Sequence, residues 1–167
     1  MTHYRRWAGP FGEMLATEED QAITGCYCIG QKYQPSIAPQ WKEDPLSPLL
    51  LQLEEQLDDY SQHPEHAFAL PLAPGGTLFQ QSVWLALQQI PTGQTRYYQQ
   101  LADSIGRPQS ARSVAAAIGR NPILILIPCH RVIGKNGSLT GFAAGLELKQ
   151  HLLHIENQAA LTNAYSH

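Results

Sequence analysis

Residues 98–118 read YQQLADSIGRPQSARSVAAAI, and this stretch decides the architecture of the second half of the chain. It holds two short helical patterns, about Tyr98–Ile105 and about Pro108–Ile118, joined by Gly106-Arg107. Two short helices that meet at a glycine-containing turn are the outline of a helix-turn-helix. We therefore expect this motif to organise the second half of the molecule.

The second helix of this motif has an unusual surface. Apart from Arg112, its first turns carry small side chains, so its backbone can approach a flat partner closely: Ser110, Ala111, Ser113, Ala115 and Ala116. Arg112 has two interpretations, a solvated helix charge or a probe on a helix pressed against DNA. Tyr97 and Tyr98 are either core aromatics or, at the first turn of the motif, residues that face the groove.

Downstream of the motif lies a thiol beside an imidazole. The apolar run 123–126 predicts a buried strand leading into the turn Ile127-Pro128-Cys129-His130-Arg131-Val132-Ile133. A thiolate is a strong nucleophile, and its reactivity depends on neighbours that lower the thiol pKa. A free cysteine is otherwise most often a buried core residue. Because side chains alternate along extended chain, His130 reaches Cys129 only if the turn bends sharply or a water intervenes.

The first half of the chain predicts a small sheet with one helix. Residues Phe11–Ala16 and Ala22–Ile29, separated by residues 17–20, have the pattern of a hairpin, and residues 30–45 that of a loop. Ser47 is placed to cap a helix with Pro48 in its first turn. The apolar stripe of that helix consists of Leu46, Leu49, Leu50, Leu53 and Leu57.

Residues 70–76 are rich in proline and glycine, which indicates a boundary between two domains. We expect an acidic scaffold domain over residues 1–76 and a mostly helical domain over residues 77–167. The second begins with a capping box, Thr77-Leu78-Phe79-Gln80, and ends with a helix over Leu146–Glu156. The predicted fold class is α+β.

Composition excludes several classes of protein. The 167 residues contain no apolar run near the ~20 residues of a membrane span and no apolar signal core at the N-terminus. The net charge is −3, but residues 1–77 carry four Lys/Arg against eleven Asp/Glu, and residues 78–167 carry seven against three. The second half therefore has the basic balance that polyanion binding requires. Three cysteines fit a reducing cytosol better than a disulfide framework.

Metal binding is a weaker interpretation. Cys26 and Cys28 with His3, His63 and His66 offer soft ligands, but the usual ligand spacings of zinc sites are missing. Packing of Cys26 and Cys28 in a strand explains these two cysteines better. We expect neither a metal nor a cofactor.

Taken together, these residues resemble the O6-alkylguanine-DNA alkyltransferase family. The similarity covers about residues 77–156 and includes the helix after Thr77, the helix-turn-helix and the Pro-Cys-His-Arg turn. Its motifs are Phe79-Gln80, Val83-Trp84, Ile90-Pro91, Gly93, Tyr98-Gln99-Gln100-Leu101-Ala102, Ile105-Gly106-Arg107-Pro108, Ala111-Arg112, Val114, Asn121-Pro122, Gly137, Thr140-Gly141-Phe142-Ala143-Ala144-Gly145-Leu146, Lys149, Leu152-Leu153 and Glu156.

The resemblance implies a catalytic set. Cys129 is the alkyl acceptor, His130 its base through a water, and Glu156 the group that holds the histidine in the needed tautomer. Asn121 is the hinge asparagine between recognition helix and active-site turn, and Tyr98 rotates the nucleotide and donates a proton to guanine N3.

The resemblance also implies a DNA-binding set. The helix-turn-helix binds the minor groove of double-stranded DNA, and Arg112 fills the space left by a flipped-out guanine. The expected contacts to DNA and the flipped base are Arg112, Tyr98, Ser110, Ala111, Ser113, Ala115, Val132, Phe142 and Ala143.

The implied reaction is DNA repair by irreversible, single-turnover transfer of an alkyl group from O6-alkylguanine to Cys129. O4-alkylthymine is a second candidate substrate. The implied protein is a cytoplasmic, nucleoid-associated monomer without membrane contact. Phe142-Ala143-Ala144-Gly145 departs from the family's usual Tyr-(Ser/Ala)-Gly-Gly and adds a methyl beside the pocket.

Two alternatives stay open at this point. A cysteine hydrolase that uses Cys129 and His130 predicts turnover, but it leaves the Arg112 helix unexplained. A non-catalytic helix-turn-helix regulator predicts that Cys129→Ala keeps function, but it leaves the Pro-Cys-His turn unexplained.

Overall fold

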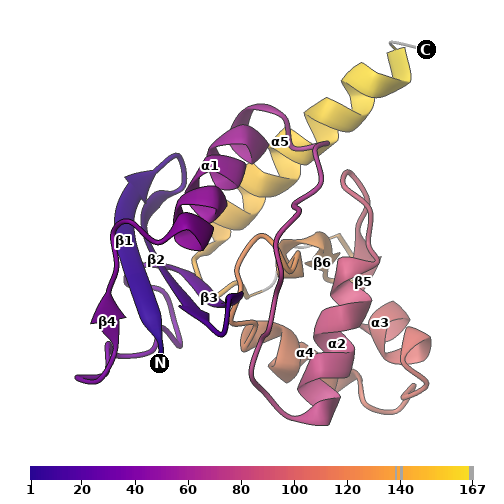
Figure 1. Ribbon diagram of the computed structural model, residues 1–167. Coiled ribbons are helices and arrows are strands. Elements are labelled where there is room, and N and C mark those ends of the chain that lie inside the picture. The colour runs from indigo at the N-terminus through magenta and orange to yellow at the C-terminus, as the bar shows by residue number, and fades with distance from the viewer. Residues whose placement is uncertain (138, 140, 166–167) are drawn as a thin grey trace. The chain divides into compact units, whose positions relative to one another are not determined.

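The structure is a computed structural model that describes residues 1–137, 139 and 141–165 (Figure 1). Thr140, part of the family resemblance, lies outside the described residues. The fold combines a four-stranded sheet with helices, which confirms the predicted α+β class.

The chain forms two compact units. The first comprises Met1–Gly75 together with Pro122–Leu124, and the second comprises Gly76–Asn121 and the chain from Ile125 onward. The assignment of residues 1–76 and 77–167 to separate domains stays a prediction.

The first unit is built on a sheet of order β3-β2-β1-β4. β1 (His3–Gly9), β2 (Gly12–Glu19) and β3 (Ala22–Cys28) are antiparallel neighbours, and β4 (Lys42–Glu43) pairs parallel to β1. β1 was not predicted, because the charged pair Arg5-Arg6 interrupts its apolar pattern. β4 lies inside the predicted loop of residues 30–45.

The β2–β3 hairpin was predicted, but its turn lies elsewhere. Thr17–Glu19 belongs to β2, and the turn consists of Asp20 and Gln21, with φ of 51° and 62°. Positive φ at both central residues defines a two-residue turn whose twist matches that of the strands, so β2 continues right up to it. The charged residues Glu18 and Glu19 resemble a turn in the sequence but lie in the strand.

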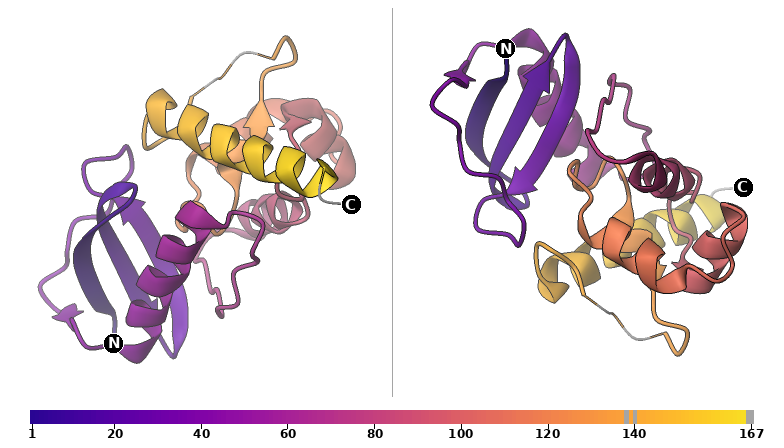
Figure 2. Two further views of the ribbon diagram at one scale, coloured as in Figure 1. Left: turned by 90° about the horizontal axis from the view of Figure 1, so that it is seen from above. Right: turned by 90° about the horizontal axis from the view of Figure 1, so that it is seen from below.

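α1 (Pro48–Gln62) covers one face of this sheet (Figure 2). Its predicted cap is confirmed, because Ser47 Oγ accepts a hydrogen bond from the Leu50 backbone N–H at 3.2 Å. Leu50, Leu53 and Leu57 are buried on the face toward the sheet, as their spacing indicates.

The second unit is mostly helical. α2 (Leu78–Gln88) begins with the predicted capping box, in which Thr77 and Gln80 exchange hydrogen bonds of 3.0 and 3.1 Å. The buried Trp84 of α2 donates its indole N–H to the Ala117 carbonyl at 2.9 Å. This bond holds α2 against the second helix of the predicted helix-turn-helix, which contains Ala117.

The two short helices of the predicted motif are present. α3 (Tyr98–Ser104) and α4 (Ala111–Gly119) contact each other and follow the predicted ranges closely. Between them Gly106 has φ of 73°, a conformation that glycine adopts without strain.

The predicted strand over residues 123–126 is wrong. Leu124 N–H bonds to the Cys26 carbonyl, but Ile125 then turns to φ of 73° and the chain leaves the sheet edge. The run is apolar because all four side chains are buried, and burial alone does not distinguish strand from buried turn.

Two further elements frame the site. β5 (Arg96–Tyr97) and β6 (Val132–Ile133) form a short parallel pair, and α5 runs over Leu146–Tyr165. α5 extends beyond the predicted end at Glu156, because the following segment contains neither Gly nor Pro. None of the described helices combines the length and apolar character that crossing a bilayer requires.

Candidate active site

Cys129 begins a single helical turn, η1 (Cys129–Arg131), directly after Pro128. Its residue surface is 5% exposed, so the thiol is nearly enclosed. The chain bends at this turn, and Cys129 and His130 are both buried in it. The sequence order Pro-Cys-His thus brings a thiol and an imidazole into one buried turn.

His130 and Glu156 form a buried pair across the second unit. His130 Nε2 lies 2.7 Å from Glu156 Oε2, and both residues are at most 1% exposed. Because an ionised carboxylate only accepts, Nε2 carries the proton and Nδ1 keeps its lone pair. Nδ1 is buried and has no hydrogen-bond partner among the described residues. Nδ1 of the imidazole is therefore available to accept a proton.

Arg131 completes the environment of Glu156. Its Nε and Nη2 donate to the two carboxylate oxygens at 2.8 and 3.0 Å, and its Nη1 donates to the Ile90 carbonyl at 2.6 Å. A fourth hydrogen bond, from Nη2 to Thr92 Oγ1, measures 3.1 Å. Bidentate geometry fixes the carboxylate plane, and therefore the direction of its bond to His130.

Two other polar side chains hold the turn from its flanks. Asn121 donates from Nδ2 to the Ile127 carbonyl at 2.8 Å, and Lys149 donates from Nζ to the Val132 carbonyl at 2.7 Å. Both are buried. They join the end of α4 and the start of α5 to the backbone on either side of Cys129.

The thiol is neutral at rest. Burial raises the pKa of Cys129 to about 11, although a hydrogen bond with Asn121 and the charge of Lys149 act in the opposite direction. Burial also lowers the pKa of His130 below its ordinary 6.5, against the opposing effect of Glu156. At neutral pH the pair is therefore a thiol and a neutral imidazole, ready to exchange a proton when a reaction demands it.

The carboxylate and the lysine are also perturbed. Burial alone would raise the pKa of Glu156, but hydrogen bonds and charges from His130 and Arg131 outweigh it and lower that pKa to about 2. Burial lowers the pKa of Lys149. Glu156 thus stays ionised over the whole physiological range.

The predicted DNA-contacting residues lie outside this buried cluster, on α4 and just before it. Arg112, Ser113 and Ala116 are exposed, while Val114 and Ala117 are buried. Ser110, Ala111 and Ala115 are partly exposed. α4 therefore presents an arginine among small side chains, as its sequence indicates.

The residues predicted to contact the base come from three segments. Tyr98 is the first residue of α3 and is partly exposed, Val132 follows η1 and is buried, and Phe142 and Ala143 are partly exposed before α5. Only Val132 of these is joined to the catalytic cluster by a hydrogen bond described above. Their placement around the base stays a prediction.

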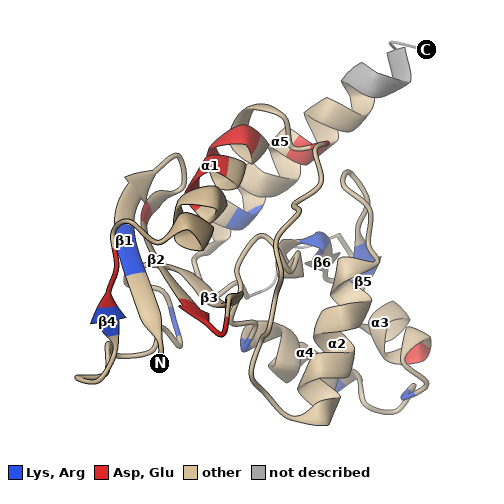
Figure 3. Ribbon diagram, viewed as in Figure 1, with Lys and Arg blue, Asp and Glu red and all other residues tan. Residues whose placement is uncertain are grey.

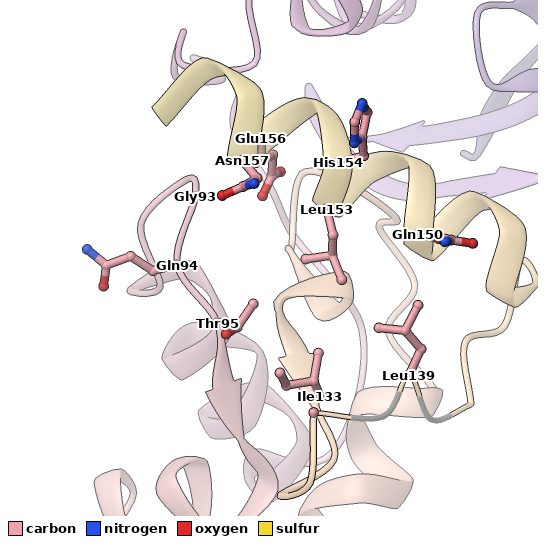
Figure 4. Close-up of a pocket in the computed structure, with 11 residues that line it drawn as sticks. Gly93, Gln94, Thr95, Ile133, Leu139, Gln150, Leu153, His154, Glu156 and Asn157 are labelled. Atoms are coloured by element: carbon pink, nitrogen blue, oxygen red, sulfur yellow. The ribbon is translucent and has the colours of Figure 1, made fainter. Parts of the chain in front are cut away.

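A pocket of about 460 Å³ lies beside Glu156, between α5 and the turn that holds Gly93 (Figure 4). Thr95, Ile133 and Leu153 point toward it, and His154 of α5 also contributes to its lining. Cys129 is not among the described residues that line it. The described lining of this pocket thus includes Glu156 of the buried cluster but not the thiol.

Sequence reasoning gave no role to Arg131 and Lys149. Arg131 had a detectable signal, since a cation next to the apolar residues Val132 and Ile133 must find a partner when it is buried, whereas the partly polar neighbours of Lys149 gave none. The residues considered as metal ligands lie in separate places. Cys26 and Cys28 lie in β3, whereas His63 and His66 lie together after α1.

Comparison with known proteins is consistent with this arrangement. Residues 78–158 match the family described as 6-O-methylguanine DNA methyltransferase, DNA binding domain. The methylated-DNA–protein-cysteine methyltransferase of Methanosarcina acetivorans is 39% identical over 92% of this chain and 97% of its own length. That of Mycobacterium tuberculosis is 41% identical, with 96% and 95% coverage.

Solved structures give the same result. The crystal structure of Mycobacterium tuberculosis OGT in complex with DNA has 38% sequence identity and a TM-score of 0.85, covering 94% of each chain. Another crystal structure of the M. tuberculosis O6-methylguanine methyltransferase has 40% identity and a TM-score of 0.86.

Proposed function

Because this chain belongs to the methylated-DNA–protein-cysteine methyltransferase family, which repairs DNA by moving an alkyl group onto a cysteine, we propose that Cys129 is the acceptor. One observation carries this proposal. Cys129 shares its turn with His130, which the ionised Glu156 holds with Nδ1 unprotonated. Neither Cys26 nor Cys28 has such a partner among the contacts described above.

The proposed transfer uses Cys129, His130 and Tyr98 together with a water molecule. The Cys129 thiol passes its proton to His130 Nδ1, through a water, as the sulfur attacks the alkyl carbon. The carbon–O6 bond breaks, a carbon–sulfur bond forms, and the guanine leaves with the electron pair. Tyr98 donates a proton to guanine N3, which makes the base a better leaving group. The His130 imidazolium returns its proton to the Tyr98 phenolate through water, the proton on guanine N3 exchanges through water to N1 to restore guanine, and Cys129 becomes a thioether.

Buried neighbours position these groups. Arg131 fixes Glu156, and Glu156 fixes the tautomer of His130, which is the order of dependence in a catalytic triad. Asn121 is placed to stabilise the developing thiolate, since its hydrogen bond with the sulfur lowers the thiol pKa. Arg131 acts as a positioning residue, whereas Asn121 acts on the reacting sulfur itself.

Recognition uses the exposed face of α4. DNA is the partner, and we infer that α4 lies in the minor groove, where small side chains permit close approach. Arg112 then enters the base stack in place of a flipped O6-alkylguanine. Ser110, Ala111, Ser113 and Ala115 contact the backbone, and Val132, Phe142 and Ala143 border the flipped base. The protein acts as a monomer.

A thioether has no easy route of hydrolysis, so each molecule reacts once. The test is the intact mass of the protein after incubation with a duplex that contains one O6-methylguanine. We expect a single added methyl group, mapped to Cys129, that saturates at one per protein. Cys129→Ser should remain unmodified while keeping its affinity for DNA.

Other outcomes separate the alternatives. Repeated turnover of a thioester or peptide substrate would support a cysteine hydrolase. A methyl group mapped to Cys26 or Cys28 would contradict the assignment of the acceptor but not the family. Absence of any adduct would contradict the proposed function as a whole.

A further inference from the structure

Away from the active site, three side chains in the first unit have the chemistry of a metal site. One potential ligand atom each from His63, Glu65 and His66 lies within 4.8 Å of the others. All three residues are exposed, so an ion can reach them from solvent. They directly follow α1, whose C-cap residue is His63.

We propose that His63, Glu65 and His66 bind a divalent transition-metal ion, with Zn²⁺ as the best match. Two imidazoles and one carboxylate are a common zinc ligand set, and a water can complete the tetrahedron. Zinc–ligand bonds of about 2.0–2.2 Å place tetrahedral ligand atoms roughly 3.4 Å apart, so the three side chains must turn toward one another when the ion binds.

The local chain already holds the two histidines together. Their rings stack with centroids 4.9 Å apart and planes inclined by 23°. The His66 backbone N–H bonds to the His63 carbonyl at 3.0 Å, and the intervening Pro64 is buried. The ligands therefore come from one short, anchored turn, so little conformational entropy is lost when the ion binds.

A fourth residue orients one of the ligands. Asp59 Oδ2 lies 2.8 Å from His66 Nδ1, so the carboxylate accepts the Nδ1 proton and leaves the Nε2 lone pair for a metal. Metal-binding histidines commonly donate their other ring N–H to a carboxylate in this way. This contact gives His66 the tautomer that a metal ligand needs.

The electrostatic surroundings also favour a cation. Residues 54–66 contain five Asp/Glu and no Lys or Arg, and acidic residues are visible along α1 in Figure 3. The C-terminal end of a helix carries a partial negative charge, and His63 lies at that end. Bound zinc would fasten the turn after α1 to the helix and stabilise the first unit.

The experiment titrates Zn²⁺ alone into the metal-free full-length protein. Calorimetry gives the stoichiometry, and the ring signals of the seven histidines in NMR spectra give the location. We expect one equivalent to shift the signals of His63 and His66. Asp59→Asn should weaken binding about tenfold or more, as loss of such an orienting partner usually does.

Two double variants decide the result. His63→Ala/His66→Ala removes exposed side chains, so it should fold normally and lose this binding. His151→Ala/His154→Ala removes an exposed pair of the same spacing from α5 and should bind zinc as the unmodified chain does. Zinc binding that survives the first variant, or that is lost in Cys129→Ser, overturns the proposal, as does no binding at all.

Discussion

At the scale of single residues, His130 is defined by the difference between its two ring nitrogens. Nε2 is engaged by Glu156, and Nδ1 is buried without a partner in the described chain. The imidazole is therefore a base of fixed orientation beside a thiol whose pKa is raised to about 11. Thiolate formation must be coupled to His130, because direct ionisation of the thiol is unfavourable at neutral pH.

This coupling predicts the pH profile of methyl transfer. The single-turnover rate should be flat from about pH 7 to 9 and fall on acidification below 6.5, as His130 becomes protonated. Rapid quench at saturating DNA measures it, with DNA affinity determined at each pH as the control. A rate that rises tenfold per unit between pH 7 and 9 would instead show reaction of a directly ionised thiolate.

Tyr98→Phe should reduce the rate of transfer far more than the affinity for DNA. General acid catalysis contributes about 10²–10⁴-fold, and loss of one hydroxyl leaves the aromatic surface in place. Rapid-quench kinetics gives the rate of transfer and a binding assay gives the affinity for DNA. Tyr97→Phe serves as the control at the neighbouring position. Equal losses of rate and affinity would assign Tyr98 to binding only.

Ala144→Gly should widen the tolerance for bulky adducts. We propose that the methyl group of Ala144 borders the base pocket, and one methylene in such a pocket changes selectivity by about 10–200-fold. We expect the ratio of benzyl to methyl transfer rates to rise in the variant. An unchanged ratio would show that this methyl group does not limit the pocket.

At the scale of elements, the β2–β3 hairpin pairs its two strands through a turn whose backbone conformation is sterically unfavourable. Asp20 and Gln21 both have positive φ, a conformation that Asp tolerates and Gln does not favour. Glycine is the preferred second residue of such turns. The hairpin therefore contains a position where the native residue is not the most stable one.

Gln21→Gly should stabilise the protein by about 1 kcal/mol, because it removes the steric cost of the left-handed conformation at an exposed site. Urea unfolding measures this gain. Gln21→Ala is the matched control, which should show no gain because alanine keeps the β-carbon. Stabilisation by both variants would indicate a different cause.

At the scale of the whole molecule, the active site also sets the response to acid. The pKa of the buried His130 is lowered, so below pH 6.5 this histidine binds a proton more readily in the unfolded chain than in the folded chain. Acid therefore favours unfolding. Glu156 has a pKa of about 2 against the ordinary 4.5, so stability falls again between those two values. Both groups make the folded state less stable as pH decreases.

We expect the free energy of unfolding to fall as the pH decreases below 6.5, with a slope that approaches about 1.4 kcal/mol per pH unit, the value for one proton. Urea unfolding between pH 7 and 5 measures this slope. His130→Gln should flatten it, whereas the exposed His154→Gln should leave it unchanged. An equal slope in all three proteins would contradict the assignment to His130.

Much of the fold follows from local sequence. Ser47 and the Thr77–Gln80 capping box start their helices where predicted, because capping depends on residues within one turn. β1 was missed because Arg5 and Arg6 interrupt its apolar pattern, and residues 123–126 were mistaken for a strand because they are apolar and buried without forming one. A strand exists only through its neighbours, which the local pattern does not specify.

For the site, the sequence by itself determined the reactive turn, the Arg112 helix and, through its resemblance, the family. Only the tertiary structure revealed that Arg131 clamps Glu156 and that burial leaves the thiol neutral with a basic nitrogen beside it. Motifs are contiguous and can be read along the chain. Burial and pairing of charges arise when residues 25 positions apart meet, so folding decides them.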